Sequence, residues 1–250
     1  MIQANHSSAS GSIVFPDKLT VAENSWRLPA AAEFYVDFET VSDLDDDFAR
    51  FPEASGQALI FMIGCGSLTQ SNTGPKWTHR VFTALNLSVT EEKRIIEDWL
   101  SHLRTECEAR QCTLENARLF HWSPAETSSL IDAYNSAHVR QGSPAWPELP
   151  WFDLLNGLVK EQPMTVRGAF GFGLKSIAKA MHANGLIESV WRDGPADGLG
   201  AMVGAWWCHR EALRQGTTMP AIGLMKEIDS YNEIDCKVMA EVLAFLRTQR

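Results

Sequence analysis

The sequence has too little positive charge to bind nucleic acid through a broadly basic surface. Its 22 lysines and arginines are outnumbered by 31 aspartates and glutamates, which gives a formal net charge of −9. An acidic protein repels the phosphate backbone over most of its surface. Any path for nucleic acid must therefore be a narrow basic strip.

The cysteines form none of the patterns that mark a disulfide scaffold or a zinc module. There are five of them, an odd number, with no CxxC pair and no zinc-type spacing to histidine. Secreted domains with disulfides and zinc-binding modules are not indicated by this pattern. We expect reduced thiols in a reducing compartment.

Long apolar runs and a signal peptide are also missing. No segment has the length of apolar residues needed to cross a bilayer, and the first residues lack a basic region followed by an apolar run. We therefore expect a cytoplasmic protein with no membrane partner.

The length of 250 residues fits one domain with a substantial core. Residues 1–30 are rich in Ser, Ala and Asn, and we interpret them as an N-terminal lead-in or linker. They either pack on the edge of the domain or join a preceding one. The domain itself is predicted to span residues 31–250.

One stretch, from Phe34 to Thr40, combines a strand pattern with two acids. Side chains alternate across a strand, so Asp37 and Glu39 share one face, while Phe34, Val36 and Phe38 point to the other. Two adjacent carboxylates repel each other unless a cation neutralises them, and Mg²⁺ or Mn²⁺ prefers such hard oxygen ligands. The alternative is an acidic solvent face on a half-exposed strand.

Further patterns predict a mixed α/β fold. Strands are expected at 58–64, 76–82 and 117–122, and a central strand buried on both faces is indicated for the first of these. Helices are expected at about 90–104, 123–137, 174–184, 201–215 and 220–248. The acid run Asp43 to Asp47 is interpreted as a solvated turn.

The last predicted helix carries Tyr231 and Asp235, which are four residues apart and therefore project from one face. In the middle of the chain, a predicted strand from Ala117 runs through His121 into a helix start at Ser123 to Glu126. Glu126 is either a metal ligand or the capping-box partner of Ser123.

These motifs together resemble those of a known family. The strand with Asp37 and Glu39, the helix start with Glu126 and the helix with Tyr231 and Asp235 resemble the three motifs of the DEDD exonucleases, in the tyrosine-bearing subgroup. With Phe152 to Leu155 and Gly173 to Ser176, they are similar to the ribonuclease H-like domain associated with RecB-type nucleases and helicases. The resemblance covers residues 33–250, and Glu126 departs from it where the family has Asp.

The resemblance implies a ribonuclease H-like fold: a mixed five-stranded sheet, an antiparallel meander followed by parallel strands, flanked by helices. It also implies a metal-dependent 3′–5′ exonuclease that hydrolyses DNA or RNA with two divalent ions, Mg²⁺ or Mn²⁺. Asp37, Glu39, Glu126 and Asp235 would be the metal ligands, and Tyr231 would orient the attacking water. A single-stranded nucleic-acid end is the expected partner, with a helicase or RecB-type nuclease module as a further one.

Four other residues are candidates for supporting roles. His121 and Asp153 would lie behind the metal ligands, although Asp153 fits a helix start equally well. Arg167 and Lys175, in a glycine-punctuated loop and the helix after it, would contact nucleic acid. The rival to the enzyme is a non-catalytic ribonuclease H-like module that binds nucleic acid or a helicase partner, and a third reading is an endonuclease.

Overall fold

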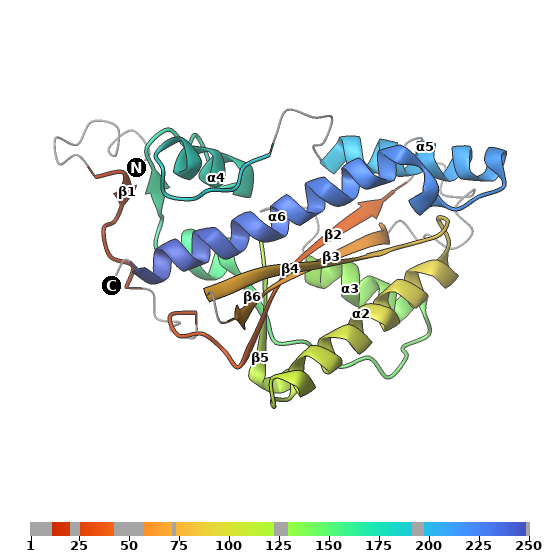
Figure 1. Cartoon of the computed structure of the whole chain (residues 1–250), viewed down its shortest axis with the longest axis horizontal. Coiled ribbons are helices and arrows are strands. Elements are labelled where there is room, and N and C mark those ends of the chain that lie inside the picture. The colour runs from red at the N-terminus through yellow and green to blue at the C-terminus, as the bar shows by residue number, and fades with distance from the viewer. Residues whose placement is uncertain are drawn as a thin grey trace.

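The fold is built on one mixed sheet with helices on both faces (Figure 1). The computed structural model describes residues 12–20, 26–42, 58–71, 74–122, 130–191 and 198–248. The predicted acidic turn at 43–47, and the segment 123–126 with Glu126, lie outside these residues.

The five-stranded sheet has the order β4-β3-β2-β5-β6. Its strands are β2 (Ala32–Val41), β3 (Leu59–Ser71), β4 (Gly74–Thr83), β5 (Ala117–His121) and β6 (Trp151–Asp153). The strands β2, β3 and β4 form an antiparallel meander, and β5 and β6 run parallel to β2. This mixed α/β sheet confirms the predicted fold class.

Strand β2 lies at the centre of the sheet and both of its faces are covered. Phe34 and Val36 are fully buried in one hydrophobic core, and Tyr35 is buried in a second core on the opposite face. The alternation predicted from the sequence is therefore confirmed. Because helices cover the face that carries the acids as well, that face is not the solvent face of a half-exposed strand.

The first core lies between the sheet and helices α2 (Val89–Ala109), α3 (Leu130–Arg140) and α5 (Gly198–Gln215). The Ser88 hydroxyl accepts a hydrogen bond from the Glu91 amide (3.3 Å), as the capping pattern predicted. Helix α2 extends to Ala109, beyond the predicted end near 104. The reason is that buried Cys107 continues the apolar stripe of Trp99 and Leu103 at helical spacing.

The second core lies between the sheet and helices α4 (Leu174–Ala183) and α6 (Gly223–Thr248). A two-stranded sheet of β1 (Val14–Phe15) and β7 (Thr165–Val166), a π-helical turn at Leu155–Val159 and the fully buried Trp26 adjoin it. Short 3₁₀ turns at Leu114–Asn116 and Met219–Ala221 precede β5 and α6.

Helix α6 crosses from one core to the other. Met225 and Ile228 near its start belong to the first core, whereas Cys236, Met239 and Leu243 belong to the second. At its last turn, Arg247 forms two hydrogen bonds to Glu33 at the start of β2, at 2.7 and 2.9 Å. The helix is thus fixed to the central strand at its far end.

A buried ion pair fixes α3 on the other side of the sheet. Glu92 of α2 is fully buried, accepts hydrogen bonds from Arg140 at 2.8 and 2.9 Å, and also accepts one from the Ile60 amide at 2.9 Å. Two helices and β3 therefore meet at a single carboxylate. Among the described helices, none has the length and apolar character that crossing a bilayer requires.

Candidate metal centre

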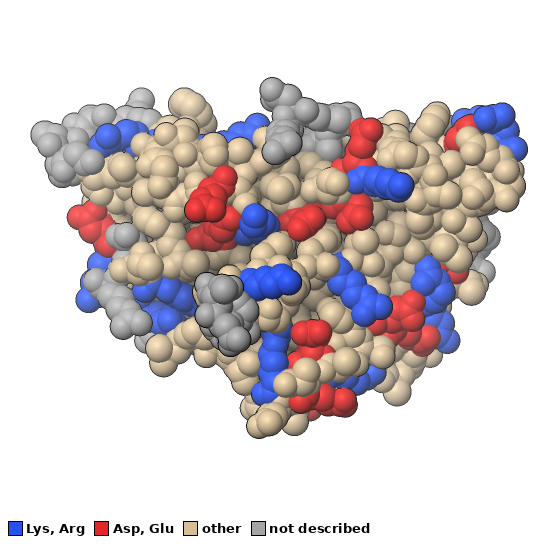
Figure 2. Space-filling model, in the orientation of Figure 1, with Lys and Arg blue, Asp and Glu red and all other residues tan. Residues whose placement is uncertain are grey.

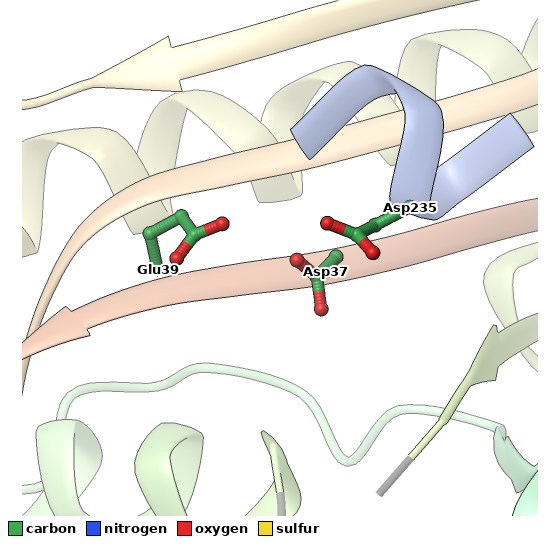
Figure 3. A group of neighbouring side chains, drawn as sticks. All are labelled: Asp37, Glu39 and Asp235. Atoms are coloured by element: carbon green, nitrogen blue, oxygen red, sulfur yellow. The ribbon is translucent and has the colours of Figure 1, made fainter. Parts of the chain in front are cut away.

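Three carboxylates meet where α6 crosses the central strand (Figure 3). Asp37 and Glu39 come from β2, and Asp235 comes from α6. One ligand atom from each side chain lies within 4.8 Å of the others. Figure 3 shows the carboxyl groups facing a common space between the strand and the helix.

The position of this cluster follows from the two side-chain periodicities. Asp37 and Glu39 share a face of β2 because strand side chains alternate, and that face is the one that α6 covers. Glu39 and Asp235 are only 6% and 7% exposed. The carboxylates are therefore held in a largely dry place rather than on a solvated surface.

Burial and mutual repulsion perturb all three acids. Burial raises the pKa of Glu39 from 4.5 to about 7. It also raises the pKa of Asp37 well above its usual range, and the charges of Asp235 and Glu39 add to this increase. The pKa of Asp235 is raised by burial and by the charge of Glu39. Such a site favours an added cation, because the cation removes the repulsion between the charged forms.

Lys175, in the first turn of α4, provides positive charge close to the cluster. Its ammonium opposes the pKa increase at Asp37, Glu39 and Asp235. Its Nζ also lies 4.7 Å from the centre of the Tyr231 ring, which is cation–π distance. The structure thus brings Lys175 of α4 against Tyr231 of α6, the helix that carries Asp235.

Asn232 was not singled out in the sequence, yet it orients Asp37. The Asn232 side chain is fully buried and its Nδ2 donates to Asp37 Oδ2 at 3.0 Å. Its position within the Tyr231 to Asp235 motif was the available signal. A residue that is three before Asp235 on a helix faces the same side, so Asn232 was a candidate by spacing.

Two glycines of β3 make room for this arrangement. Gly64 pairs with Asp37, and a Cβ at Gly64 would lie 1.6 Å from Asn232 Oδ1 and 3.1 Å from His79 Nε2. A Cβ at Gly66 would lie 2.0 Å from the Trp77 ring. The absence of side chains at these positions lets polar and aromatic groups approach the strand closely. The glycines interrupt an apolar strand pattern, which was the signal in the sequence.

Trp191 adjoins the cluster from a loop that is fixed to α6. Its indole N–H opposes the pKa increase of Asp235. The Glu241 carboxylate accepts hydrogen bonds from the amides of Glu188 and Ser189, both at 2.8 Å. These bonds hold the loop against α6 at Ser189, two residues before Trp191. No pattern in the sequence indicated this contact.

His121 and Asp153 pair with each other at the ends of β5 and β6. Neither is a member of the carboxylate cluster found among the described residues. Asp153 Oδ1 accepts hydrogen bonds from the amides of Leu155 and Asn156, at 2.9 and 3.1 Å, so the carboxylate caps the turn that follows β6. Burial lowers the pKa of His121, which is 1% exposed.

The two basic candidates lie in different places. Lys175 lies beside the carboxylates, whereas Arg167 donates to the Ser12 carbonyl (3.0 Å) and lines a surface pocket. Figure 2 shows acidic and basic side chains interspersed on the visible face, without a continuous basic strip over its described part. Glu126 lies outside the described residues.

The chemistry of the cluster is that of a hard divalent cation site. Carboxylate oxygens from a rigid strand and a helix are the ligands that Mg²⁺ and Mn²⁺ prefer. The site has no thiol or imidazole ligand among the three described members, which disfavours zinc. No model of a known protein family matches this sequence, and no curated protein is significantly similar to it.

Proposed function

We propose that this protein is a metal-dependent 3′–5′ exonuclease. The observation that carries the proposal is the convergence of Asp37, Glu39 and Asp235 within 4.8 Å at a buried junction of β2 and α6. The mixed five-stranded sheet is the scaffold on which the resemblance to the tyrosine-bearing DEDD enzymes expects these acids. The direction of digestion comes from that resemblance alone.

The residues at the junction fit a divalent metal. Asp37, Glu39 and Asp235 would hold Mg²⁺ or Mn²⁺, and Glu126 would complete a set of four ligands for two ions. When bound, such ions polarise the scissile phosphate and lower the pKa of a coordinated water. The raised pKa values of the three acids are a second support, because they indicate that charge compensation is needed.

The other side chains have roles that do not depend on the metal. Asn232 holds Asp37 through its amide. Lys175 would attract the phosphate backbone to the site, since its ammonium lies close enough to oppose the pKa increase of all three acids. Tyr231 would orient the attacking water through its hydroxyl, because a tyrosine phenol is a poor base at neutral pH.

We further propose that the enzyme works in the cytoplasm on a single-stranded end. All five cysteines are free, as expected in a reducing compartment. A helicase or RecB-type nuclease module would be its partner, as the resemblance implies. An associated helicase would supply single-stranded nucleic acid. The candidate metal site between β2 and α6 would then receive its end.

The test is a cleavage assay on 5′-labelled single-stranded DNA and RNA in Mg²⁺, in Mn²⁺ and in chelator. We expect a ladder that shortens from the 3′ end with metal. Asp37→Asn should lower the rate by more than the roughly 10- to 100-fold that loss of an outer-shell partner costs. Asp98→Asn, which changes an acid that is 54% exposed on α2, is the control with the same charge change and should cleave normally.

Three outcomes would contradict the proposal. Intact substrate in every lane, from protein with a cooperative thermal transition, would favour the non-catalytic module. Equal cleavage by the wild type and Asp37→Asn would point to a contaminating nuclease. Cleavage of a circular single strand would instead identify an endonuclease.

A further inference from the structure

A second candidate site lies along α4, beyond Lys175, which is the residue of this helix beside the carboxylates. A surface pocket of about 480 Å³ is formed by the end of β7, the loop after it and α4. Its lining comprises Arg167, Gly168, Phe170, Ser176, Lys179, Ala180, Ala183 and Asn184. The described structure of the metal centre uses none of these residues.

The wall of this pocket is held in place by several hydrogen bonds. The Ser176 hydroxyl accepts from the amides of Phe170 and Gly171, both at 3.1 Å. The Asn184 amide donates to the carbonyls of Arg167 and Ala180, at 2.9 and 2.7 Å. These bonds tie the loop to both ends of α4, so the pocket is already formed without a ligand.

The loop also depends on a glycine and on the core. Gly168 has a φ of +94°, a backbone conformation that residues other than glycine rarely adopt. The Trp122 indole donates to the Phe172 carbonyl at 3.2 Å, which joins the loop to the end of β5. The loop of the pocket is therefore joined to the residue that follows β5, the strand next to β2 in the sheet.

The charge of the pocket points to an anionic ligand. Within the described ranges, none of the ion pairs includes Arg167 or Lys179. The two cations give the pocket a positive charge in a protein whose net charge is −9. A phosphate would supply the missing negative charge.

The pocket also offers an aromatic surface. Phe170 is 88% exposed, the highest value among the exposed large apolar side chains that the structure describes. Ala180 and Ala183 have small side chains, so a planar group can approach this face of α4 closely. An exposed ring beside two cations is the combination with which proteins hold single-stranded nucleic acid, by stacking and by phosphate contact.

We infer that this pocket binds one nucleotide unit of a single-stranded nucleic acid. Arg167 and Lys179 contact its phosphate, and its base stacks on Phe170. Lys179 lies four residues after Lys175, so the pocket is one helical turn, about 6 Å, further along α4 than the group beside the carboxylates. The inference rests on the proposed function, because the strand held here is the strand whose end reaches the metal centre.

The test measures binding without cleavage. Fluorescence anisotropy with a labelled 12-nucleotide single-stranded DNA and the matching RNA is recorded in chelator, between about 25 and 200 mM salt. Arg167→Ala/Lys179→Ala should weaken binding at least tenfold and reduce the slope of log affinity against log salt by about 0.7 for one lost phosphate. Phe170→Ala should weaken binding roughly tenfold.

The control removes two positive charges from the opposite side of the sheet. Lys93→Ala/Arg104→Ala changes the half-exposed Lys93 and the exposed Arg104 of α2, and it should bind like the wild type. Phe170→Ala and the single variant Lys179→Ala alter exposed side chains, so they test the pocket even if loss of Arg167 disturbs the contact with Ser12. Circular dichroism confirms that each variant is folded.

Three results would overturn the inference. The first is no measurable binding by the wild type, and the second is equal affinity of the wild type and the pocket variants. The third is displacement of the labelled strand by a mononucleotide that is added at the same concentration at which the strand itself binds. Since metal is absent, failure here is separate from failure of the nuclease proposal. If the wild type cleaves but all variants bind the strand equally well, only the inference about the pocket is contradicted. If binding depends on the pocket but no cleavage occurs with metal, only the nuclease proposal is contradicted.

Discussion

At the scale of single residues, the central feature is a set of three neighbouring acids whose negative charges repel each other. Glu39 and Asp235 are buried and Asp37 is partly buried, each beside another carboxylate, and each has a raised pKa. Lys175 and the amide of Asn232 relieve part of the charge. Buried acids that remain close together at this energetic cost are typical of functional sites.

The first prediction concerns the pH dependence of stability in chelator. The pKa of Glu39 is about 7 in the folded protein and 4.5 ordinarily, so between these values the folded state binds more protons than the unfolded state. The free energy of unfolding should therefore fall as the pH rises from 4.5 to 7, by about 3 kcal/mol from this residue. Denaturant titrations at pH 5, 6, 7 and 8 measure this directly.

Glu39→Gln provides the comparison, because it removes the titrating group and keeps the shape. Its stability should depend less steeply on pH than that of the wild type. Glu97→Gln, at a residue 51% exposed on α2, should leave the pH dependence unchanged. An equal pH dependence in the wild type and Glu39→Gln would contradict the raised pKa, because the comparison cancels other groups such as His121, whose pKa burial lowers.

At the scale of elements, the contact between β3 and α6 determines the orientation of Asp37. Gly64 stands opposite Asp37 in the sheet, and the Asn232 side chain of α6 lies directly over Gly64. Asn232 then reaches Asp37 with its Nδ2. The orientation of Asp37 on β2 is thus controlled by a residue without a side chain, Gly64, on the neighbouring strand.

The second prediction is that Gly64→Ala impairs the site more than the fold. The new Cβ would displace Asn232 and break its bond to Asp37, which should reduce cleavage roughly 10- to 100-fold. Overpacking should lower stability by about 1–3 kcal/mol. Gly157→Ala is the matched control, because its Cβ would meet Phe152 only at 3.6 Å.

A double variant separates displacement of Asn232 from general damage. Gly64→Ala/Asn232→Ala removes the atom that the new Cβ would meet, so it should recover stability relative to Gly64→Ala. Its cleavage rate should remain low because the amide that holds Asp37 is gone. Wild-type activity in Gly64→Ala would refute the positioning role of Asn232.

At the scale of the whole molecule, α6 connects the two hydrophobic cores. Its first half packs in one core and its second half in the other, and the carboxylate cluster lies between them. A cation held by β2 and α6 together would cross-link the central strand to this helix. Binding at the site should therefore stabilise the entire fold.

The third prediction is that Mn²⁺ or Mg²⁺ raises the melting temperature of chelator-treated protein. Ion at 100 times its dissociation constant adds about 2.7 kcal/mol, which corresponds to roughly 5–10 °C for a chain of this size. Asp235→Asn should lose most of the shift, and Asp98→Asn should keep it. Calorimetry measures the shift, and an equal shift in wild type and Asp235→Asn would place the ions elsewhere.

Much of the scaffold was predictable because its signals are local. The alternation in β2, the apolar stripe of α2 and the cap at Ser88 each depend on neighbours within a few residues. The assignment of Asp37, Glu39 and Asp235 to one place came from motif order and resemblance. The contributions of Asn232, Trp191 and Gly64 were missed, since each depends on a partner from another element.

The sequence by itself determined the kind of elements and the faces on which the acids stand, because hydrophobic periodicity and capping act over short distances. The mixed sheet was implied by the resemblance of the motifs. Only the tertiary structure decided that Asp235 meets Asp37 and Glu39 in a nearly dry junction, that Lys175 lies over Tyr231, and that α4 carries a basic pocket. The physical reason is that the path of α6 across the sheet is set by packing against both cores. That packing depends on side chains distributed over the whole chain.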